Sequence, residues 1–268
     1  MKSLSDISLF LFDMDGTLYL GEKLFPFTKE LLRAIRESGR KYLYITNNSS
    51  KSAADYVRKL ARLGIAATED EFVTSAQATA KYLRENLPEK KFFVMGTESL
   101  KSEFTKSGLT VTEDADGADA AVLGFDTELT FKKLDDVCRL LSTKPGVPYI
   151  ATHPDMVCPT EYGSVPDCGS FIEMIYNAVK RRPVIIGKPE PEMIILAAER
   201  GGAPLTRTAV VGDRLYTDVK SGINAGAVSV LVLSGETSRE DAAKSDVLPD
   251  FILCDAGEII PALSEAAK

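Results

Sequence analysis

The sequence has few of the residues that build zinc sites or disulfide-bonded folds. Its 268 residues include one histidine, His153, and no C-x-x-C pair among the four cysteines. These cysteines are Cys138, Cys158, Cys168 and Cys254. A zinc site needs several Cys or His ligands at closer spacing than this. We therefore expect free thiols in a reducing cytoplasm.

Basic clusters and long apolar runs are missing too. The chain carries 32 basic and 39 acidic residues, a net charge of −7. Phosphate backbones and anionic membrane surfaces repel such a chain, so we expect no nucleic-acid partner. The first apolar run, Leu9–Phe12, is far too short for a signal sequence or a membrane span. These absences predict a cytoplasmic protein without membrane association.

What the sequence does contain is a regular alternation of short apolar runs and helical patterns. Each run is apolar almost throughout, which is typical of strands covered on both faces of a parallel sheet. The runs are Leu9–Phe12, Tyr42–Ile45, Val184–Ile186, Ala209–Val211, Val228–Leu233 and Phe251–Leu253. One of the intervening helices is opened by Pro191 and ended by Gly201-Gly202. The alternation predicts an α/β fold, a doubly wound parallel-sheet (Rossmann-like) core.

The middle of the chain has the pattern of a second domain. Its own expected strands are Phe92–Met95, Ala120–Gly124 and Tyr149–Thr152. Its clearest helix repeats apolar residues at i, i+3, i+4 and i+7 from Leu134. Because segments on both sides of it are needed to complete the outer sheet, the middle is predicted to be an insertion. We place the outer domain at residues 1–79 and 182–268 and an inserted α/β domain at residues 80–181.

One stretch, "SLFLFDMDGTLYLG" (Ser8–Gly21), ends a buried strand with two carboxylates. In an extended chain residues i and i+2 point the same way, so Asp13 and Asp15 both face the sheet edge. Asp213 follows another strand and is expected at the same edge. Clustered carboxylates suit a hard octahedral cation, which favours Mg²⁺ over zinc or copper. The sequence therefore predicts a magnesium site beyond the strand ends.

Two other strand ends carry groups that suit a phosphate. Tyr42–Ile45 leads to Thr46-Asn47-Asn48, and Val184–Ile186 leads to Gly187-Lys188-Pro189. Lys188 supplies a positive charge, while Thr46 and nearby backbone N–H groups supply neutral donors. A cation at the carboxylates would let them approach an anionic phosphate. Together the four strand ends predict a site for one phosphate and one divalent cation.

Four short motifs carry a family resemblance: "DMDGT", "TNNSS", "GKP" and "GDRLYTD". They occur in the order of the four motifs of the haloacid dehalogenase superfamily. The sequence is most similar to its phosphatase branch with a large α/β cap between the second and third motifs, the NagD-like and 4-nitrophenylphosphatase-like proteins. Leu123–Leu134 and Thr152–Ser170 look like signatures of that cap. Four motifs in order, each at a predicted strand end, make a specific match over almost the whole chain.

The resemblance implies a role for each aspartate. Asp13 would be the nucleophile that forms an aspartyl-phosphate, and also a metal ligand. Asp15 would protonate the leaving alkoxide and then take a proton from the hydrolytic water, and its backbone carbonyl would ligate Mg²⁺. Asp213 would be the third protein ligand to the metal. Asp218 would lie behind a metal-bound water.

The resemblance also implies which groups hold the phosphate. Thr46, Asn47 and Asn48 would bind it, and Lys188 would neutralise it and orient Asp13.

Further candidates leave alternatives open. Arg214 either reaches the rim of the site or pairs with Asp218 at the start of a helix. Asp155 and His153, in the cap signature, could face the substrate. The alternative for His153 is a hydrogen-bonded structural histidine. We expect Asp126 to be a structural carboxylate that caps a strand end.

The resemblance implies a Mg²⁺-dependent phosphomonoester hydrolase. Because a cap of about 100 residues would close over the site, the substrate is expected to be a small soluble phosphate. Sugar phosphates are our first choice, ahead of nucleotides and pyridoxal phosphate. The resemblance also suggests a homodimer formed through the cap.

Three alternatives belong to other classes. A receiver-like signalling module also holds an aspartyl-phosphate with Asp, Thr, Lys and Mg²⁺. It has no inserted domain between Thr46 and Lys188, and Asp15 would shorten the life of its phosphoryl group. A phosphomutase would need a bound bisphosphate intermediate. A catalytically silent binding protein would not need the complete set of polar residues.

Overall fold

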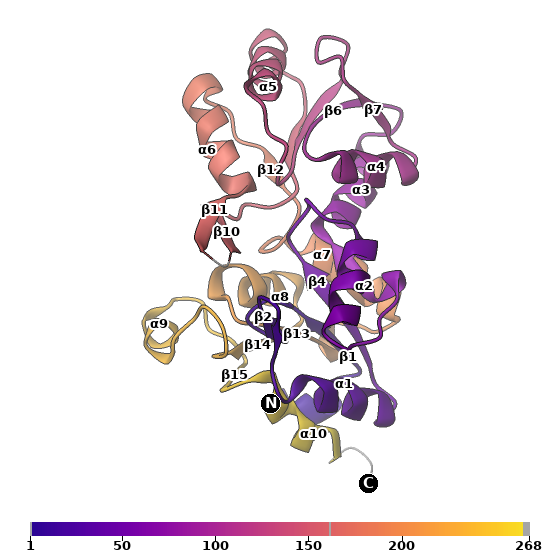
Figure 1. Ribbon diagram of the computed structural model, residues 1–268, viewed down its shortest axis with the longest axis vertical. Coiled ribbons are helices and arrows are strands. Elements are labelled where there is room, and N and C mark those ends of the chain that lie inside the picture. The colour runs from indigo at the N-terminus through magenta and orange to yellow at the C-terminus, as the bar shows by residue number, and fades with distance from the viewer. Residues whose placement is uncertain (1, 161, 265–268) are drawn as a thin grey trace. The chain divides into compact units, whose positions relative to one another are not determined.

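The computed structural model describes residues 2–160 and 162–264, which form two compact units (Figure 1). The first, here called the core unit, contains the chain up to Thr46, the segment Ala53–Val73 and the chain from Lys188 onward. The second, here called the inserted unit, contains Asn47–Ser52 and Thr74–Gly187. Each unit is built around its own parallel sheet.

The core unit has a six-stranded sheet with β1 near its middle. In spatial order the strands are β15 (Phe251–Leu253), β14 (Val228–Val232), β13 (Thr208–Gly212), β1 (Leu9–Phe12), β4 (Lys41–Thr46) and β5 (Phe72–Thr74). β1 runs parallel to both of its neighbours, with Phe12 in register with Val211 of β13 and Tyr44 of β4. The carboxyl ends of these three strands therefore meet at one edge, where ligands bind in open α/β sheets.

The apolar sequence of β1 explains its central position. Its four residues, Leu9–Phe12, are fully buried. Phe10 and Phe12 stack with ring centroids 6.0 Å apart and share a core cluster with Leu31 of α1 (Thr28–Glu37). Leu9 points to the opposite face and packs against Gly201 of α7 (Glu192–Gly201). Helices thus cover both faces of β1, as its sequence predicts.

The helices of the core unit follow the strands in the expected alternation (Figure 1). They are α1 (Thr28–Glu37), α2 (Ala53–Arg62), α7 (Glu192–Gly201), α8 (Lys220–Ala225), α9 (Arg239–Lys244) and α10 (Ile260–Ser264). Shorter 3₁₀ turns cover Leu4–Asp6, Glu69–Glu71, Leu205–Arg207 and Ala256–Ile259, and a π-helix covers Leu215–Val219. A small antiparallel hairpin, β2 (Tyr19–Leu20) and β3 (Lys23–Leu24), follows β1. As expected, α7 begins after Pro191 and ends at Gly202, which is left-handed.

The inserted unit has a five-stranded sheet of its own. Its order is β12 (Val184–Ile185), β9 (Tyr149–Ala151), β8 (Ala120–Leu123), β6 (Lys91–Met95) and β7 (Thr110–Thr112), with all neighbours parallel. The helices are α3 (Ser75–Asn86), α4 (Glu98–Lys106), α5 (Phe131–Thr143) and α6 (Cys168–Val179). An antiparallel hairpin, β10 (Val157–Thr160) and β11 (Gly163–Pro166), precedes α6. α5 and α6 pack together through apolar side chains such as Val137 and Ile172.

The structure confirms the predicted fold class, an α/β core with a second parallel sheet in an inserted domain. One strand was assigned to the wrong sheet. The run Val184–Ile186 forms β12, which pairs with β9 in the inserted unit and not with a strand of the core. The predicted division near residue 80 falls inside α3, whereas the compact units divide before Thr74 and after Gly187. Because α3 packs as a single helix within the inserted unit, the boundary between the units lies before α3 and not inside it.

Among residues 2–160 and 162–264, no helix combines the length and the apolar composition needed to cross a bilayer. The four cysteines are free thiols, as expected.

Candidate active site

Asp13 lies directly beyond the buried end of β1. Its backbone N–H donates to the Val211 carbonyl at 2.9 Å, which continues the ladder between β1 and β13 by one residue. The side chain is mostly buried, with 18% of its surface exposed. The rigid sheet therefore fixes the position of this carboxylate.

Asp213 follows β13, the neighbour of β1, and is 3% exposed. Its carboxylate accepts a hydrogen bond from the Glu236 backbone N–H at 2.7 Å and a longer one from the Thr17 hydroxyl at 3.4 Å. Close by, the Ser234 hydroxyl donates to the Gly16 carbonyl at 2.7 Å. Two segments, one after β1 and one after β14, thus hold Asp213 in place.

Asp218 comes from the π-helix Leu215–Val219 and is 1% exposed. A π-helix is rare and occurs mostly as one turn at functional sites. Its carboxylate accepts from the Arg214 backbone N–H at 3.1 Å. A Cβ on Gly212 would lie 2.3 Å from the Asp218 Cβ, so only glycine at the end of β13 permits this approach. The wide turn and the glycine together bring Asp218 against the strand end.

Lys188 connects two of these carboxylates. Its Nζ donates to Asp13 Oδ1 at 2.7 Å and to Asp218 Oδ1 at 2.6 Å, and the residue is 2% exposed. One carboxylate oxygen from each of Asp13, Asp213 and Asp218 lies within 4.8 Å of the other two. Four side chains, from positions 13, 188, 213 and 218 of the sequence, therefore meet at one end of the core sheet. This placement was predicted for three of them, Asp13, Lys188 and Asp213.

The crowding of negative charge changes the protonation of the cluster. Burial raises the pKa of Asp13 from 3.8 to about 7; Lys188 opposes this shift, and Asp218 and Asp213 add to it. Burial and the charge of Asp218 raise the pKa of Asp213 to about 6. For Lys188, burial lowers the pKa, but Asp13 and Asp218 outweigh it and raise the pKa above its ordinary value. The Lys188 ammonium is therefore stabilised in its charged form, whereas Asp13 and Asp213 take up protons more readily than free carboxylates do.

This chemistry fits a divalent cation. The donors are carboxylate oxygens, which Mg²⁺ prefers. Their spacing is that of groups sharing one ion, and the raised pKa values of Asp13 and Asp213 record negative charge that Lys188 does not offset. Asp13, Asp213 and Asp218 are the acidic groups that the structure gathers here, so Asp218 stands closer to a metal position than the sequence suggested.

Asp15 is placed apart from these three carboxylates. Its side chain is 50% exposed, with Oδ2 at 3.9 Å from the Lys59 ammonium and Oδ1 at 3.5 Å from the Gly21 backbone N–H. Lys59 in turn lies over the ring of Tyr19, 4.1 Å from its centroid. An exposed carboxyl group beside the strand end is suited to exchange protons with a leaving group or with water.

The remaining predicted residues of the core unit lie near strand ends. Thr46 ends β4, is 8% exposed, and its hydroxyl is 3.5 Å from the Tyr56 hydroxyl. The Arg214 side chain pairs with Glu236 at 2.8 Å, and its backbone, not its guanidinium, binds Asp218. This contact with Glu236 was not among the two alternatives considered for Arg214.

The other predicted residues belong to the inserted unit. Asn47 Nδ2 donates to both oxygens of Asp155 at 3.2 Å, and Asn48 Oδ1 accepts from the Ser50 hydroxyl at 2.7 Å. His153 is fully buried beside Asp155. Asp126 accepts from the Glu128 backbone N–H at 2.9 Å, a local contact of the kind expected of a structural carboxylate.

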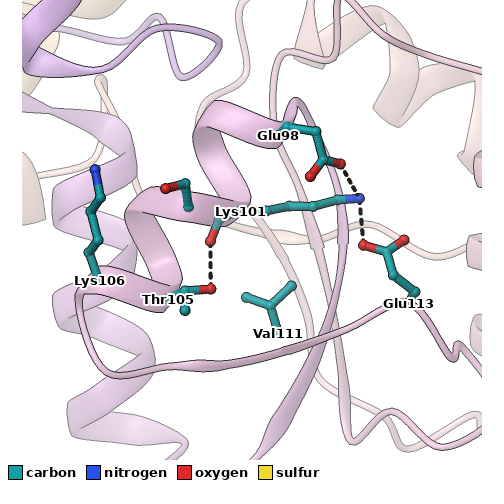
Figure 2. A pocket seen from close by; sticks show the side chains of 7 residues that line it. Glu98, Lys101, Thr105, Lys106, Val111 and Glu113 are labelled. Atoms are coloured by element: carbon teal, nitrogen blue, oxygen red, sulfur yellow. Dashed lines mark hydrogen bonds and ion pairs between the residues drawn. The ribbon is translucent and has the colours of Figure 1, made fainter.

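A surface cavity of about 360 Å³ lies elsewhere in the inserted unit, between α4 and β7 (Figure 2). The Lys101 ammonium in its wall pairs with Glu98 at 2.9 Å and with Glu113 at 2.7 Å. These two glutamates neutralise the charge of Lys101. The cavity lining contains none of the residues predicted for the site. We do not assign the activity to this cavity.

Sequence reasoning missed the residues that hold Asp213. Thr17 was quoted within "DMDGT" without a role, and Ser234 and Glu236 were not considered. A signal was available, because Ser234 and Glu236 follow the predicted strand Val228–Leu233. The rule that directed attention to four strand ends applies equally to this fifth one.

Comparisons with known proteins identify the family of the chain. Residues 10–110 match the haloacid dehalogenase-like hydrolase family, and residues 185–259 match a second, HAD-like hydrolase family. The acid sugar phosphatase of Staphylococcus aureus is 34% identical over 256 residues, which cover 96% of this chain and 98% of that protein.

Two solved structures are similar along nearly their whole length. The 4-nitrophenylphosphatase of Thermotoga maritima has 44% identity and a TM-score of 0.91, covering 97% of this chain and 98% of its own. NagD from E. coli K-12 has 30% identity and a TM-score of 0.86, covering 96% and 98%. The chain therefore belongs to the haloacid dehalogenase-like hydrolases, in the NagD and 4-nitrophenylphosphatase group of phosphatases with an inserted cap domain.

Proposed function

We propose that this protein is a Mg²⁺-dependent phosphomonoester hydrolase that works through an aspartyl-phosphate on Asp13. The observation that carries the proposal is the bond from the buried Lys188 ammonium to Asp13 Oδ1, within a cluster that also contains Asp213 and Asp218. A carboxylate can attack a phosphate only if the carboxylate stays ionised and the negative charge of the phosphate is offset. Lys188 does the first and is placed to contribute to the second.

In the first step, a carboxylate oxygen of Asp13 attacks the phosphorus atom and the bond to the ester oxygen breaks. The leaving alkoxide takes a proton from Asp15, which is protonated at this stage. Lys188 stays paired with Asp13 and orients the oxygen that attacks. Thr46, Asn47 and Asn48 are proposed to donate hydrogen bonds to the phosphoryl oxygens.

In the second step, water attacks the phosphorus of the aspartyl-phosphate and its proton passes to Asp15. The bond between phosphorus and Asp13 breaks, which releases inorganic phosphate and restores the carboxylate. Asp15 thus serves as acid and then as base, for which its exposed position is suited.

For the cation we propose Asp13, Asp213 and the Asp15 backbone carbonyl as protein ligands, with Asp218 behind a bound water. When bound, Mg²⁺ supplies positive charge that screens the carboxylates and polarises the phosphoryl group. The raised pKa values of Asp13 and Asp213 support this assignment, because they reflect charge that a cation would neutralise.

For the substrate we propose a small soluble phosphate, with sugar phosphates first and nucleotides or pyridoxal phosphate after them. The name of the S. aureus relative, an acid sugar phosphatase, supports this order. The free thiols are in keeping with a cytoplasmic location, which is part of the proposal.

The test compares wild type with Asp13→Asn. We expect wild type with Mg²⁺ to release phosphate from 4-nitrophenyl phosphate and from sugar phosphates in a colorimetric assay. Asp13→Asn should fold with an unchanged circular dichroism spectrum and lose activity to below about one thousandth, because the amide is not a nucleophile. EDTA should abolish wild-type turnover, and excess Mg²⁺ should restore it.

Turnover by Asp13→Asn at a rate near that of wild type would refute the nucleophile. Undiminished turnover in EDTA would remove the cation from the proposal.

A further inference from the structure

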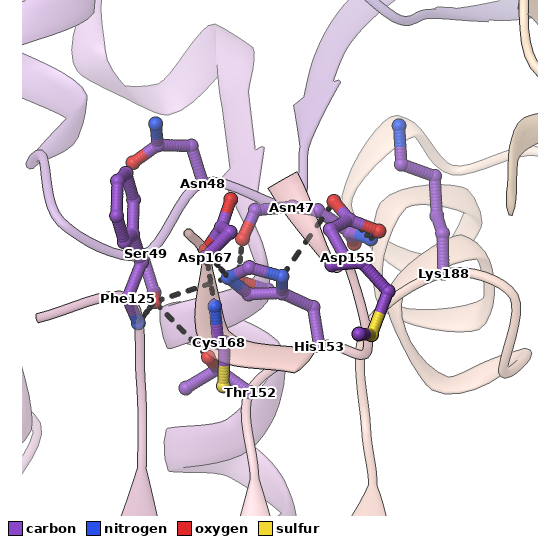
Figure 3. A network of polar contacts seen from close by, with 12 residues as sticks. Asn47, Asn48, Ser49, Phe125, Thr152, His153, Asp155, Asp167, Cys168 and Lys188 are labelled. Carbon is purple, nitrogen blue, oxygen red and sulfur yellow. Dashed lines mark hydrogen bonds and ion pairs between the residues drawn. The ribbon is translucent and has the colours of Figure 1, made fainter. Parts of the chain in front are cut away.

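The inserted unit contains a buried histidine between two buried carboxylates (Figure 3). His153 is fully buried, with Nδ1 at 3.5 Å from Asp155 Oδ2 and Nε2 at 3.6 Å from Asp167 Oδ1. The Ser49 hydroxyl lies 3.5 Å from the same Nε2. Asp155 and Asp167 are 8% and 3% exposed. Two carboxylates removed from water need polar partners, and the ring between them is placed to contact both.

His153, Asp155 and Asp167 each offer one atom within 4.8 Å of the others, a spacing that a metal ion could also use. The ring, however, lies between the two carboxylates, with Asp155 nearest to Nδ1 and Asp167 nearest to Nε2. Asp167 Oδ1 is also engaged as the cap of α6, accepting from the Cys168 backbone N–H at 2.6 Å. A ring that contacts one carboxylate at each nitrogen, and so keeps both in place, explains the geometry better.

The network ends at a residue next to the proposed phosphate site. Asp155 accepts from Asn47 Nδ2 with both oxygens at 3.2 Å, and the Ser75 hydroxyl donates to the Asn47 carbonyl. Asn47 follows Thr46 of β4 directly in the chain. The side chain and the backbone of Asn47 are therefore both fixed, and the fixing group for the side chain is the carboxylate that His153 holds.

Gly187, the last residue of the inserted unit, lies against Asn47 and His153. A Cβ on Gly187 would lie 2.7 Å from Asn47 Oδ1 and 3.1 Å from the His153 Cβ, so this position packs tightly on both residues. Gly187 precedes Lys188 directly. The His153 network thus contains Asn47 and adjoins, through single peptide bonds, Thr46 and Lys188, which the proposed function also assigns to the phosphate.

We propose that His153 is a positioning residue for phosphate binding. By bridging Asp155 and Asp167 it holds Asp155 against Asn47, and so fixes the donor groups that follow Thr46. This inference rests on the proposed function, since it concerns the same phosphate. It predicts an effect on binding of the phosphate and little effect on the chemical step.

The experiment measures KM and kcat for 4-nitrophenyl phosphate and the inhibition constant for inorganic phosphate. His153→Asn should raise KM and the inhibition constant by about tenfold while kcat changes by less than about threefold, because a contact that positions Asp155 before the reaction is lost. His153→Gln, whose amide can reach one carboxylate, should give a smaller rise. Asp155→Asn should raise KM as well, and adding His153→Asn to it should raise KM no further.

The matched control is Asp126→Asn. Asp126 is a buried carboxylate of the same unit that pairs with Lys133 at 2.8 Å and with the Glu128 backbone N–H. Its loss should lower the melting temperature and leave KM unchanged. If His153→Asn does not fold, Asp167→Asn replaces it, because asparagine keeps an acceptor for the Cys168 N–H while the charge is lost.

Several results would overturn the inference. They are an unchanged KM in folded His153→Asn, a loss confined to kcat, additive effects in the double variant, or stoichiometric zinc that the variant lacks. Failure of the proposed function gives a different pattern, because wild type itself would then release no phosphate. An active wild type with normal KM in the variants rejects the role of His153 alone.

Discussion

At the residue scale, the site is defined by buried carboxylates whose ionised forms are disfavoured by their surroundings. Asp13 and Asp213 are buried beside Asp218, and burial raises the pKa of each. Such an arrangement is costly for stability, and under the proposed function it would attract a cation and leave a carboxylate available for attack. Lys188 compensates part of the charge through its bonds to Asp13 and Asp218.

Stability against pH tests this charge in the metal-free protein. The pKa of Asp213 is raised in the folded state to about 6, so its ionisation costs stability as the pH rises from about 4 through about 6. Asp213→Asn lacks that charge and keeps an acceptor for the Glu236 N–H. In EDTA at about pH 8 the variant should be more stable than wild type by on the order of 3 kcal/mol, with the difference shrinking toward about pH 4.

Urea unfolding at several pH values measures this, with Asp250→Asn as the control of opposite sign. Burial would raise the pKa of Asp250, but Lys2 and Ser229 lower it below its ordinary value. Asp250 therefore stabilises the protein above its unfolded pKa, and its replacement should weaken the protein at neutral pH. An Asp213→Asn protein that is less stable than wild type at about pH 8 in EDTA would contradict the account.

The sequence predicted part of this cluster and not all of it. Asp13, Lys188 and Asp213 follow from strand ends, since carboxyl ends of parallel strands share an edge. The direct bond between Lys188 and Asp218 did not follow, because it depends on a turn geometry that sequence periodicity does not reveal. The exposed placement of the Asp15 carboxylate was hidden for a similar reason, since residues beyond a strand end no longer obey its alternation.

At the element scale, the π-helix Leu215–Val219 does most to shape the site. It is wider than an α-helix by one residue per turn, and it carries Asp218 on its inner side against Gly212 at the end of β13. The strand and the turn therefore act as one element. A side chain at position 212 would separate them.

Gly212→Ala tests this close approach. The new Cβ would lie 2.3 Å from Asp218, so the turn must move and take Asp218 away from Lys188. We expect a loss of about 2 kcal/mol in the free energy of unfolding and a fall in kcat/KM of roughly a hundredfold, as seen when packed groups are overfilled and reacting groups displaced. Gly146→Ala is the control, because a Cβ at Gly146 meets open space.

Denaturant unfolding and 4-nitrophenyl phosphate kinetics give both numbers. An active Gly212→Ala protein with wild-type kcat/KM would show that Asp218 is not needed where the structure places it.

Strand prediction succeeded on the bounds of continuous apolar runs and failed on which strand one run, Val184–Ile186, pairs with. β1 and β15 have the predicted bounds, because continuous apolar runs between polar residues leave little choice. β12 is two residues long, so its composition carries no information about which sheet it joins. The strands β5 and β7 were not predicted, since each is only three residues long and includes threonine, so neither forms a continuous apolar run.

At the scale of the whole molecule, two units share one chain that passes between them more than once. The core sheet takes strands from both ends of the sequence, and the inserted unit has its own sheet and its own core. The sequence predicted this nesting because the middle segment carries its own strands and helices. It could not predict the short segment Asn47–Ser52, which belongs to the inserted unit although it follows β4 of the core. The homodimer suggested by the family resemblance stays a prediction, which light scattering in solution would test.

The central claim is that the phosphoryl group passes through Asp13, and trapping it there is the most direct measurement. Wild type, Asp13→Asn and Asp15→Asn are mixed with ³²P-labelled 4-nitrophenyl phosphate and Mg²⁺, quenched in acid and digested for peptide mapping. Nitrophenolate leaves without a proton, so Asp15→Asn should form the intermediate and hydrolyse it slowly, giving more label than wild type. The account predicts alkali-labile label on the peptide that contains Asp13 and none in Asp13→Asn; label on another residue, or label retained by Asp13→Asn, would contradict it.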